Sequence, residues 1–458
     1  MTGRAALGVS LALAPASALA CALPPSVILT LPTGYYMAGA AATVALTALI
    51  AASTHRLPAF RAHLLWDRPV LLPDTLASYL SFLGLLGLLF LGLTGARDPM
   101  HNLLPLVIWV GLWVVLPLAT MLLGNLWRGL TPWAGPVRLT RLLLGWQGSI
   151  GLARLGYWPA TAGLLAFTWF QLMSMTPEDP QVLATAIAAY WGLIFVLAVL
   201  EGEDWLHHGE FLTVYLTALS RIAPFWVQID GTRARRYAGL PGAQVLHMPA
   251  LTPSAVIFLT LALAALTFDG LMETFFWLAL IGENPLEFTG RSAVQGVNTA
   301  GLLAVWALTA ATILGALALG RAVSRSARPF WAEAGPAMLA FLAIAAGYHA
   351  AHYLLTLLTT GQYALAALND PFFRGDALLG LEPFYVSFGF LTDRTLMQAI
   401  WTAQFVLILA AHLLALVLAL HLSRRLGHSP ALAHLPMTLL MIGYTTLGLW
   451  LLSSPRGA

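Results

Sequence analysis

Residues 297–328 read VNTAGLLAVWALTAATILGALALGRAVSRSAR, an apolar run that stops at Gly320 and is followed by Arg321, Arg325 and Arg328. A helix rises about 1.5 Å per residue, so about 20 apolar residues cross a hydrocarbon core roughly 30 Å thick. The stretch therefore predicts a membrane-spanning helix whose end is marked by arginines.

Apolar runs of this length, separated by short charged segments, recur along the whole chain of 458 residues, of which 59% are hydrophobic and 9% charged. Such a composition is rare among soluble domains, and the alternating ten-residue segments of a membrane β-barrel are absent from the sequence. We therefore expect an all-α fold, a polytopic integral membrane helical bundle with about ten transmembrane helices. The predicted spans are 34–54, 77–95, 102–124, 156–174, 179–200, 254–280, 297–320, 335–359, 398–422 and 432–452.

The arginines occupy every second gap between these spans. The five gaps after the odd-numbered spans hold sixteen of them: Arg56, Arg61, Arg68, Arg128, Arg138, Arg141, Arg154, Arg221, Arg233, Arg235, Arg236, Arg321, Arg325, Arg328, Arg424 and Arg425. The other gaps and the C-terminal tail hold five and are richer in Asp and Glu. Basic loops stay in the cytoplasm, so both mature termini are predicted to lie outside.

Residues 1–20 have the form of a signal peptide, with Arg4, an apolar stretch and then Ala18-Leu19-Ala20. Plain cleavage and lipidation of Cys21, the only cysteine, remain alternatives. The rest, 21–458, is predicted to be a single transmembrane domain in a bacterial inner membrane, with the lipid bilayer as its partner. No basic tail or zinc-finger spacing is present, which argues against a nucleic-acid partner.

Two connections are too long for simple turns. The predicted cytoplasmic segment 201–253 contains an acidic and histidine-rich start, a short apolar stretch at 211–227 and the basic residues 233–236. The apolar stretch predicts an interfacial or re-entrant helix. The predicted outer loop 360–397 is long enough to form a lid, and long ordered loops often carry function.

Four ionisable residues inside the predicted spans form the main candidate site. Asp269 and Glu273 are four residues apart on the sixth span, and His349 and His352 are three apart on the eighth, so each pair shares a helix face. Counted from the predicted outer helix ends, Asp269 lies at the depth of His349, and Glu273 at that of His352. Because ionisable groups are costly inside a membrane, partners at matching depth are expected. The set predicts a proton site or a site for a divalent transition metal.

Other interpretations of the buried polar residues stay open. His349 and His412 on consecutive spans are candidates for ligating a b-type haem or a metal, together with His352. Glu203, Asp204, His207 and His208 are weaker metal candidates, because such runs more often form a solvated helix end. The four residues of the main site are equally compatible with structural hydrogen bonds between helices.

The stretch from Phe268 to Trp277, reading FDGLMETFFW, is followed by Asn284-Pro-Leu-Glu-Phe288 and by Gly290-Arg-Ser292. These residues faintly resemble stretches in uncharacterised polytopic membrane proteins of bacteria. The resemblance implies a membrane protein and no particular activity.

From the residues, we expect membrane transport of a small solute or ion, coupled to protons or metal through Asp269, Glu273, His349 and His352. The alternatives are a membrane redox protein with haem or metal, and a structural or assembly subunit of a larger membrane complex. The sequence does not decide whether the protein is an enzyme.

Overall fold

The computed structural model describes residues 33–53, 57–70, 72–287, 290–382, 385–425 and 431–455. The predicted signal peptide 1–20 and Cys21 lie outside the described residues.

Helices dominate the described chain. The α-helices are α1 (Thr33–Ser53), α2 (Asp74–Thr94), α3 (Leu103–Leu106), α4 (Leu116–Leu123), α5 (Trp127–Leu130), α6 (Ala134–Leu144), α7 (Trp158–Met173), α8 (Pro180–Glu201), α9 (Leu206–Gly209), α10 (Phe211–Ser220), α11 (Pro253–Met272), α12 (Phe275–Leu280), α13 (Arg291–Ser324), α14 (Phe330–Met338), α15 (Phe341–His352), α16 (Leu354–Asn369), α17 (Arg394–Arg425) and α18 (Leu435–Ser453). A π-helix, η1 (Val107–Val115), joins α3 to α4, and short 3-10 turns are η2 (Leu152–Leu155), η3 (Glu203–Trp205), η4 (Val245–His247), η5 (Gly389–Leu391) and η6 (Ala431–His434). The strands are β1 (Ala62–Pro69), β2 (Phe225–Asp230) and β3 (Arg233–Gly239).

The chain is a multi-pass membrane protein by the length and composition of its helices. Eight helical segments of the described residues are long and apolar enough to cross a membrane: 74–94, 103–123, 180–201, 253–272, 291–324, 330–352, 394–425 and 435–453. The helical class of the prediction is confirmed. The other two predicted spans, 34–54 and 156–174, coincide with helices α1 and α7, and their crossing of the membrane stays a prediction.

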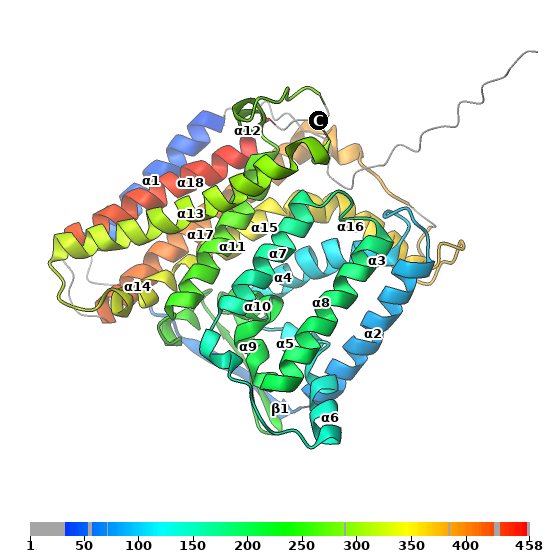
Figure 1. Cartoon of the computed structure of the whole chain (residues 1–458). Helices are drawn as coiled ribbons and strands as arrows, with labels where there is room; N and C mark the ends of the chain where they lie inside the picture. Colours follow the sequence, from blue (N-terminus) through cyan, green and yellow to red (C-terminus); the bar gives the residue numbers. More distant parts are fainter. Residues whose placement is uncertain are drawn as a thin grey trace, which may run out of the picture.

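Helix α11 runs through the middle of the bundle, with α1, α13, α17 and α18 on one side and α2, α3 and α8 on the other (Figure 1). In the most apolar part of α11, 78% of the residues are buried inside the protein, against 11% in α2. Helix α2 thus offers its apolar side chains to lipid, while α11 is surrounded by protein. Polar groups on α11 must therefore find their partners in other helices.

A three-stranded antiparallel sheet lies at the end of the bundle that carries the arginine-rich loops, which we call the basic end (Figure 1). The strand order is β1-β3-β2, and β1 pairs with β3 from Ala62 opposite Gly239 to Pro69 opposite Arg233. The sequence analysis did not predict this sheet. It took residues 233–236 as a basic cluster, whereas they form most of β3.

Local chemistry explains the hairpin of β2 and β3. Asp230 pairs with Arg233, so only Gly231 and Thr232 form the turn. Gly231 has a φ of 58°, a left-handed value that two-residue hairpin turns require and glycine adopts without strain. The Asp67 carboxylate on β1 accepts from Arg233 at 2.8 Å and from Arg235 at 3.2 Å, which ties β1 to β3.

Only the first part of the apolar stretch 211–227 is helical: residues 211–220 form α10, and residues 225–227 belong to β2. Eight of the ten residues of α10 are buried among other helices, and its position in the membrane stays a prediction.

At the opposite end, which we call the acidic end, part of the predicted outer loop 360–397 is helical, since α16 continues to Asn369. The next residue, Asp370, accepts from the N–H groups of Arg374 at 2.8 Å and Gly375 at 2.6 Å. Burial alone would raise the pKa of Asp370, but these backbone donors outweigh it and lower the pKa overall. The segment is therefore a folded turn where it leaves the bundle.

Candidate functional site

Asp269 lies in the last turn of α11, just before the helix ends. The Thr252 hydroxyl caps the start of the helix by accepting from Ala255 N at 3.4 Å, and Pro253 fits the first turn because N–H groups there have no helical partner. The helix stops at Met272, and Thr274 caps the separate helix α12 by accepting from Trp277 N at 3.2 Å. Asp269 is thus held by a buried helix near its end.

Asp269 forms a buried cluster with two side chains from the end of α15. His352 Nε2 lies 2.9 Å from Asp269 Oδ2, and the Tyr353 hydroxyl donates to the same oxygen at 2.9 Å. The side chains of Asp269 and His352 are 16% and 8% exposed. We call Asp269, His352 and Tyr353 the Asp269 cluster.

The absence of a side chain at Gly270 allows this close approach. A Cβ at Gly270 would lie 3.2 Å from the Tyr348 hydroxyl and 3.7 Å from the His352 ring, so glycine leaves room for both rings against α11. The ring of Tyr348 is stacked on His352 with centroids 6.0 Å apart. The cluster therefore depends on the pattern Asp269-Gly270 and not on the carboxylate alone.

The Tyr353 hydroxyl connects the cluster to two further helices. It accepts from Trp113 Nε1 at 2.8 Å and from Gln171 Nε2 at 3.4 Å. An indole N–H can only donate, so the hydroxyl proton of Tyr353 is free to point to Asp269. Elements η1, α7, α11 and α15 thus meet at one phenol oxygen.

His349 is bonded to other partners, one turn away from the Asp269 cluster. Its Nε2 lies 3.0 Å from the Trp113 carbonyl oxygen and its Nδ1 lies 2.9 Å from the Tyr215 hydroxyl. A carbonyl oxygen only accepts, so Nε2 carries the proton and Nδ1 accepts from Tyr215. Both ring nitrogens of His349 are therefore occupied.

The structure brings Asp269 into contact with a different histidine from the one that the sequence analysis paired with it. The sequence analysis paired Asp269 with His349 and Glu273 with His352, whereas the structure pairs Asp269 with His352. The depths had been counted from ends at 280 and 359, whereas α11 ends at Met272 and α15 at His352. These two errors, of eight and seven residues, nearly cancel, so the exchange of histidines reflects how the two helices pack and not where they end. Glu273 is the half-buried residue that follows the last turn of α11.

His349 and His412 are not directed at one site. Gly347 faces α17, since a Cβ there would lie 2.2 Å from the Ala411 Cβ. Two residues further along a helix is a turn of about 200°, so His349 points away from α17. His412 Nδ1 is bonded to the Ile408 carbonyl at 2.8 Å on its own helix. His412 Nε2 is buried and has no partner among the described residues.

The weaker metal candidates do not share a site either. Glu203 forms an ion pair with Arg138, and the His208 ring packs edge-on against Tyr157 with centroids 5.2 Å apart. The continuous helix assumed from the spacing is not present, because η3, which contains Glu203 and Asp204, is a 3-10 turn and His207 belongs to α9. In the described part of the chain, no three His, Cys, Asp or Glu side chains are grouped to hold a metal ion.

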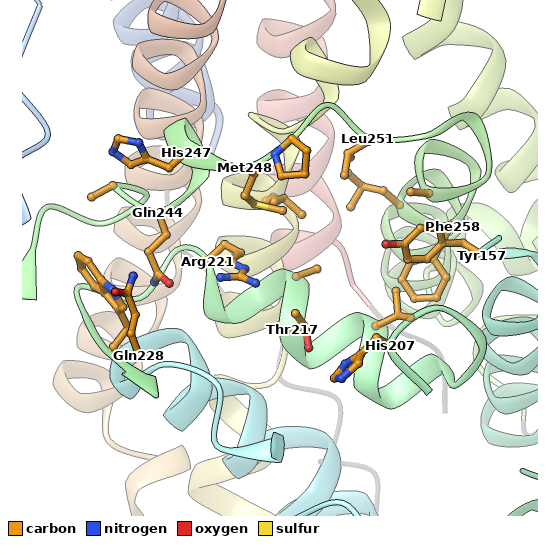
Figure 2. Close-up of a pocket in the computed structure, with 18 of the residues that line it drawn as sticks. Tyr157, His207, Thr217, Arg221, Gln228, Gln244, His247, Met248, Leu251 and Phe258 are labelled. Atoms are coloured by element: carbon orange, nitrogen blue, oxygen red, sulfur yellow. The ribbon is translucent and has the colours of Figure 1, made fainter. Parts of the chain in front are cut away.

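A second candidate site is a cavity of about 680 Å³ near the sheet (Figure 2). It is lined by residues of α10, β2, β3 and η4 and by the start of α11. We call it the Arg221 cavity, after the arginine near the middle of Figure 2. Its His207 is the one residue of the predicted metal candidates that lines it.

The sequence analysis missed Tyr353, Trp113 and Tyr215. A weak signal was present for Tyr353, which follows a candidate histidine directly. No feature of the sequence indicated which hydroxyl would meet His349.

The chain matches no protein-family model, no curated protein and no solved structure. Function must therefore be inferred from the two sites themselves.

Proposed function

We propose that the protein is a carrier in a bacterial inner membrane that moves a small solute or ion, coupled to protons through the Asp269 cluster. The observation that carries the proposal is the 2.9 Å contact between His352 and Asp269 inside membrane-spanning helices. Ionisable residues at such positions are costly and commonly mark ion or proton pathways.

The cluster contains the groups that proton exchange needs. A carboxylate and an imidazole in contact share one proton at low energetic cost, because each stabilises the charged form of the other. His352 Nδ1 is buried and has no partner among the described residues, so it is the atom from which a proton or a solute is exchanged. Glu273, next to the end of the same helix, is the second carboxylate of the path.

Protons fit the site better than a metal ion. The cluster offers one carboxylate, one imidazole and one phenol, whereas structural and catalytic zinc sites use at least three His, Cys, Asp or Glu ligands. His349 is not available as a further ligand, because both its nitrogens are bonded.

The proposal includes an orientation with the basic end in the cytoplasm, supported by the sixteen arginines of the odd-numbered gaps. Single cysteines at two exposed positions test it in a Cys21→Ser background: Thr232→Cys in the hairpin turn and Leu378→Cys at the acidic end. In intact cells, an impermeant maleimide should label Leu378→Cys only. Labelling of Thr232→Cys under the same conditions contradicts the orientation.

Proteoliposomes that contain a pH-sensitive dye test the coupling. A panel of small carboxylates, amino acids, phosphate and divalent cations is added outside, and the internal pH is followed. We expect at least one class to drive a pH change. Asp269→Asn should reduce that change by about 100-fold, because the neutral amide keeps the size of the side chain but cannot titrate.

Thr267→Val is the matched control on the same helix, since it removes a hydroxyl bonded to Tyr444 at 2.9 Å but no titratable group. Its flux per folded molecule should stay within about twofold of the parent protein. His352→Asn and Glu273→Gln should lose flux and remain folded. Flux that is unchanged in Asp269→Asn, per folded molecule, contradicts the coupling.

A further inference from the structure

The Arg221 cavity owes its shape to one face of α10. Val214, Thr217, Ala218 and Arg221 line it, and this spacing of three, four and seven residues places all four on the same side of a helix. Tyr215 on the same helix points instead to His349. The cavity and the Asp269 region therefore lie on different sides of α10.

The cavity has two buried hydrogen-bond donors without a partner among the described residues. Arg221 Nε and Trp226 Nε1 are both buried, and neither has a partner among the described residues. Both residues line the cavity, and no Asp or Glu is among its described lining residues. A buried cation and a buried N–H without partners each carry a desolvation cost that a bound acceptor would remove.

Both apolar and polar residues surround Arg221. In Figure 2, Met248, Leu251 and Phe258 lie to the right of and above Arg221, while Gln244 lies on its other side. Burial lowers the pKa of Arg221. The volume of about 680 Å³ is that of a typical small-molecule pocket.

We propose that this cavity binds an amphiphilic anion, with a phosphate or carboxylate head on Arg221 and Trp226 and an apolar body against Met248, Leu251 and Phe258. An anionic head supplies the acceptor that both buried donors lack. The apolar body would cover the apolar side chains of the lining, which a free inorganic anion would leave in contact with water. This inference does not rest on the proposed transport function.

Calorimetric titration tests the proposal with purified protein in nanodiscs of phosphatidylcholine. Decyl phosphate is the principal probe, decanoate tests the other head, inorganic phosphate tests the head alone, and decyltrimethylammonium tests the tail with the opposite charge. We expect saturable binding of decyl phosphate and decanoate at one site per chain. Inorganic phosphate should bind at least about 10-fold more weakly, and decyltrimethylammonium should not bind saturably.

Arg221→Gln should weaken decyl phosphate binding by about 10- to 100-fold, since a hydrogen bond to a charged group contributes more than a neutral one. Arg221→Lys should retain part of the affinity. The matched control is Arg154→Gln, because Arg154 is an exposed arginine of the same basic end that does not line the cavity. That variant should bind within about twofold of the parent protein.

Trp226→Phe keeps an aromatic ring beside Tyr237 and removes the N–H together with part of the indole, so it tests the second donor if Arg221→Gln fails to fold. It should weaken binding by about 3- to 10-fold. Equal binding of decyl phosphate and decyltrimethylammonium overturns the proposal. So does unchanged affinity in both Arg221→Lys and Trp226→Phe. Equal affinity for inorganic and decyl phosphate overturns the amphiphile and leaves a simple anion site.

Discussion

The Asp269 cluster and the Arg221 cavity both bury an ionisable side chain, but they treat its charge in opposite ways. Asp269 Oδ2 accepts from Tyr353 and lies in contact with His352, so the protein itself supplies its partners. Arg221 has a buried Nε without a partner, in a cavity without acidic lining residues. A charge that is satisfied from within suits proton exchange, whereas a charge that is left unsatisfied suits binding of a ligand from outside.

Helix α10 connects the two regions. Its Tyr215 donates to His349 on one side, and its Arg221 lines the cavity on the other. Substitutions that act on the Asp269 cluster or on the Arg221 cavity, but not on both, test whether the two regions differ in this way.

The largest effect on stability is expected from His352→Leu. It leaves the Asp269 carboxylate buried with Tyr353 as a remaining donor, and removing one member of a buried ion pair typically costs about 3–5 kcal/mol. The free energy of unfolding, measured by denaturant titration in detergent, should fall by that amount. His352→Gln retains a donor and should recover part of it. A loss below about 1 kcal/mol in His352→Leu would show that the pair is not coupled in the folded protein.

Gly347→Ala should disturb the Asp269 cluster far more than the cavity, to which α15 contributes only Leu342. A Cβ at this position would lie 2.2 Å from the Ala411 Cβ and 3.0 Å from the Leu407 carbonyl oxygen, so α15 must move away from α17. Overpacking of this kind costs about 1–3 kcal/mol. Gly443→Ala is the control, because a Cβ there meets nothing within 4 Å. Affinity for decyl phosphate should be unchanged in both variants, and a parallel loss in Gly347→Ala would contradict the separation of the two regions.

Arg221→Met should have the opposite sign from His352→Leu. It replaces a buried charge that has no acid beside it with an apolar side chain of similar length, so the ligand-free protein should gain about 1 kcal/mol. Unfolding of ligand-free protein measures the gain, and the same variant should lose decyl phosphate binding. A loss of stability comparable to that of His352→Leu would mean that Arg221 has a structural partner and that the contrast between the two regions is false.

The sequence predicted the helices well because each is specified locally by a long apolar run. The residues at which the helices end were harder to predict. The break after Glu273 depends on the Thr274 cap, and the break at Tyr353 has no comparable signal. The two end errors, of eight residues for α11 and seven for α15, nearly cancel in the depth comparison. Asp269 meets His352 because of the way α11 and α15 pack, which the position of a helix end does not determine.

The sheet and the cavity could not be predicted because they depend on contacts between distant parts of the chain. Strand β1 precedes the second span, and β3 follows the short helix α10, yet Asp67 pairs with Arg233 and Arg235. Nothing local in residues 233–236 distinguishes a strand from an arginine-rich loop at a membrane surface. Arg221 was noted only as one of the sixteen arginines, since its burial is visible only once α10 is packed.

The smallest effect concerns the sheet, which forms part of the cavity wall through Trp226 and Tyr237. The hydrogen bond from Arg233, helped by Arg235, holds the pKa of Asp67 below its ordinary value of 3.8. A carboxylate with a lowered folded-state pKa stabilises the fold above the unfolded-state value, and this contribution is lost as the pH falls through the lower folded-state pKa. The thermal midpoint of Asp67→Asn should therefore lie slightly below that of the parent protein from about pH 7 to pH 5, and the gap should close towards pH 3. Asp230→Asn is the control, because that side chain is 77% exposed and lies 3.5 Å from Arg235 at the hairpin end. If the gap for Asp67→Asn is the same at pH 7 and pH 3, the ion pairs do not hold the sheet, and the wall that positions Trp226 must be held by the backbone ladder alone.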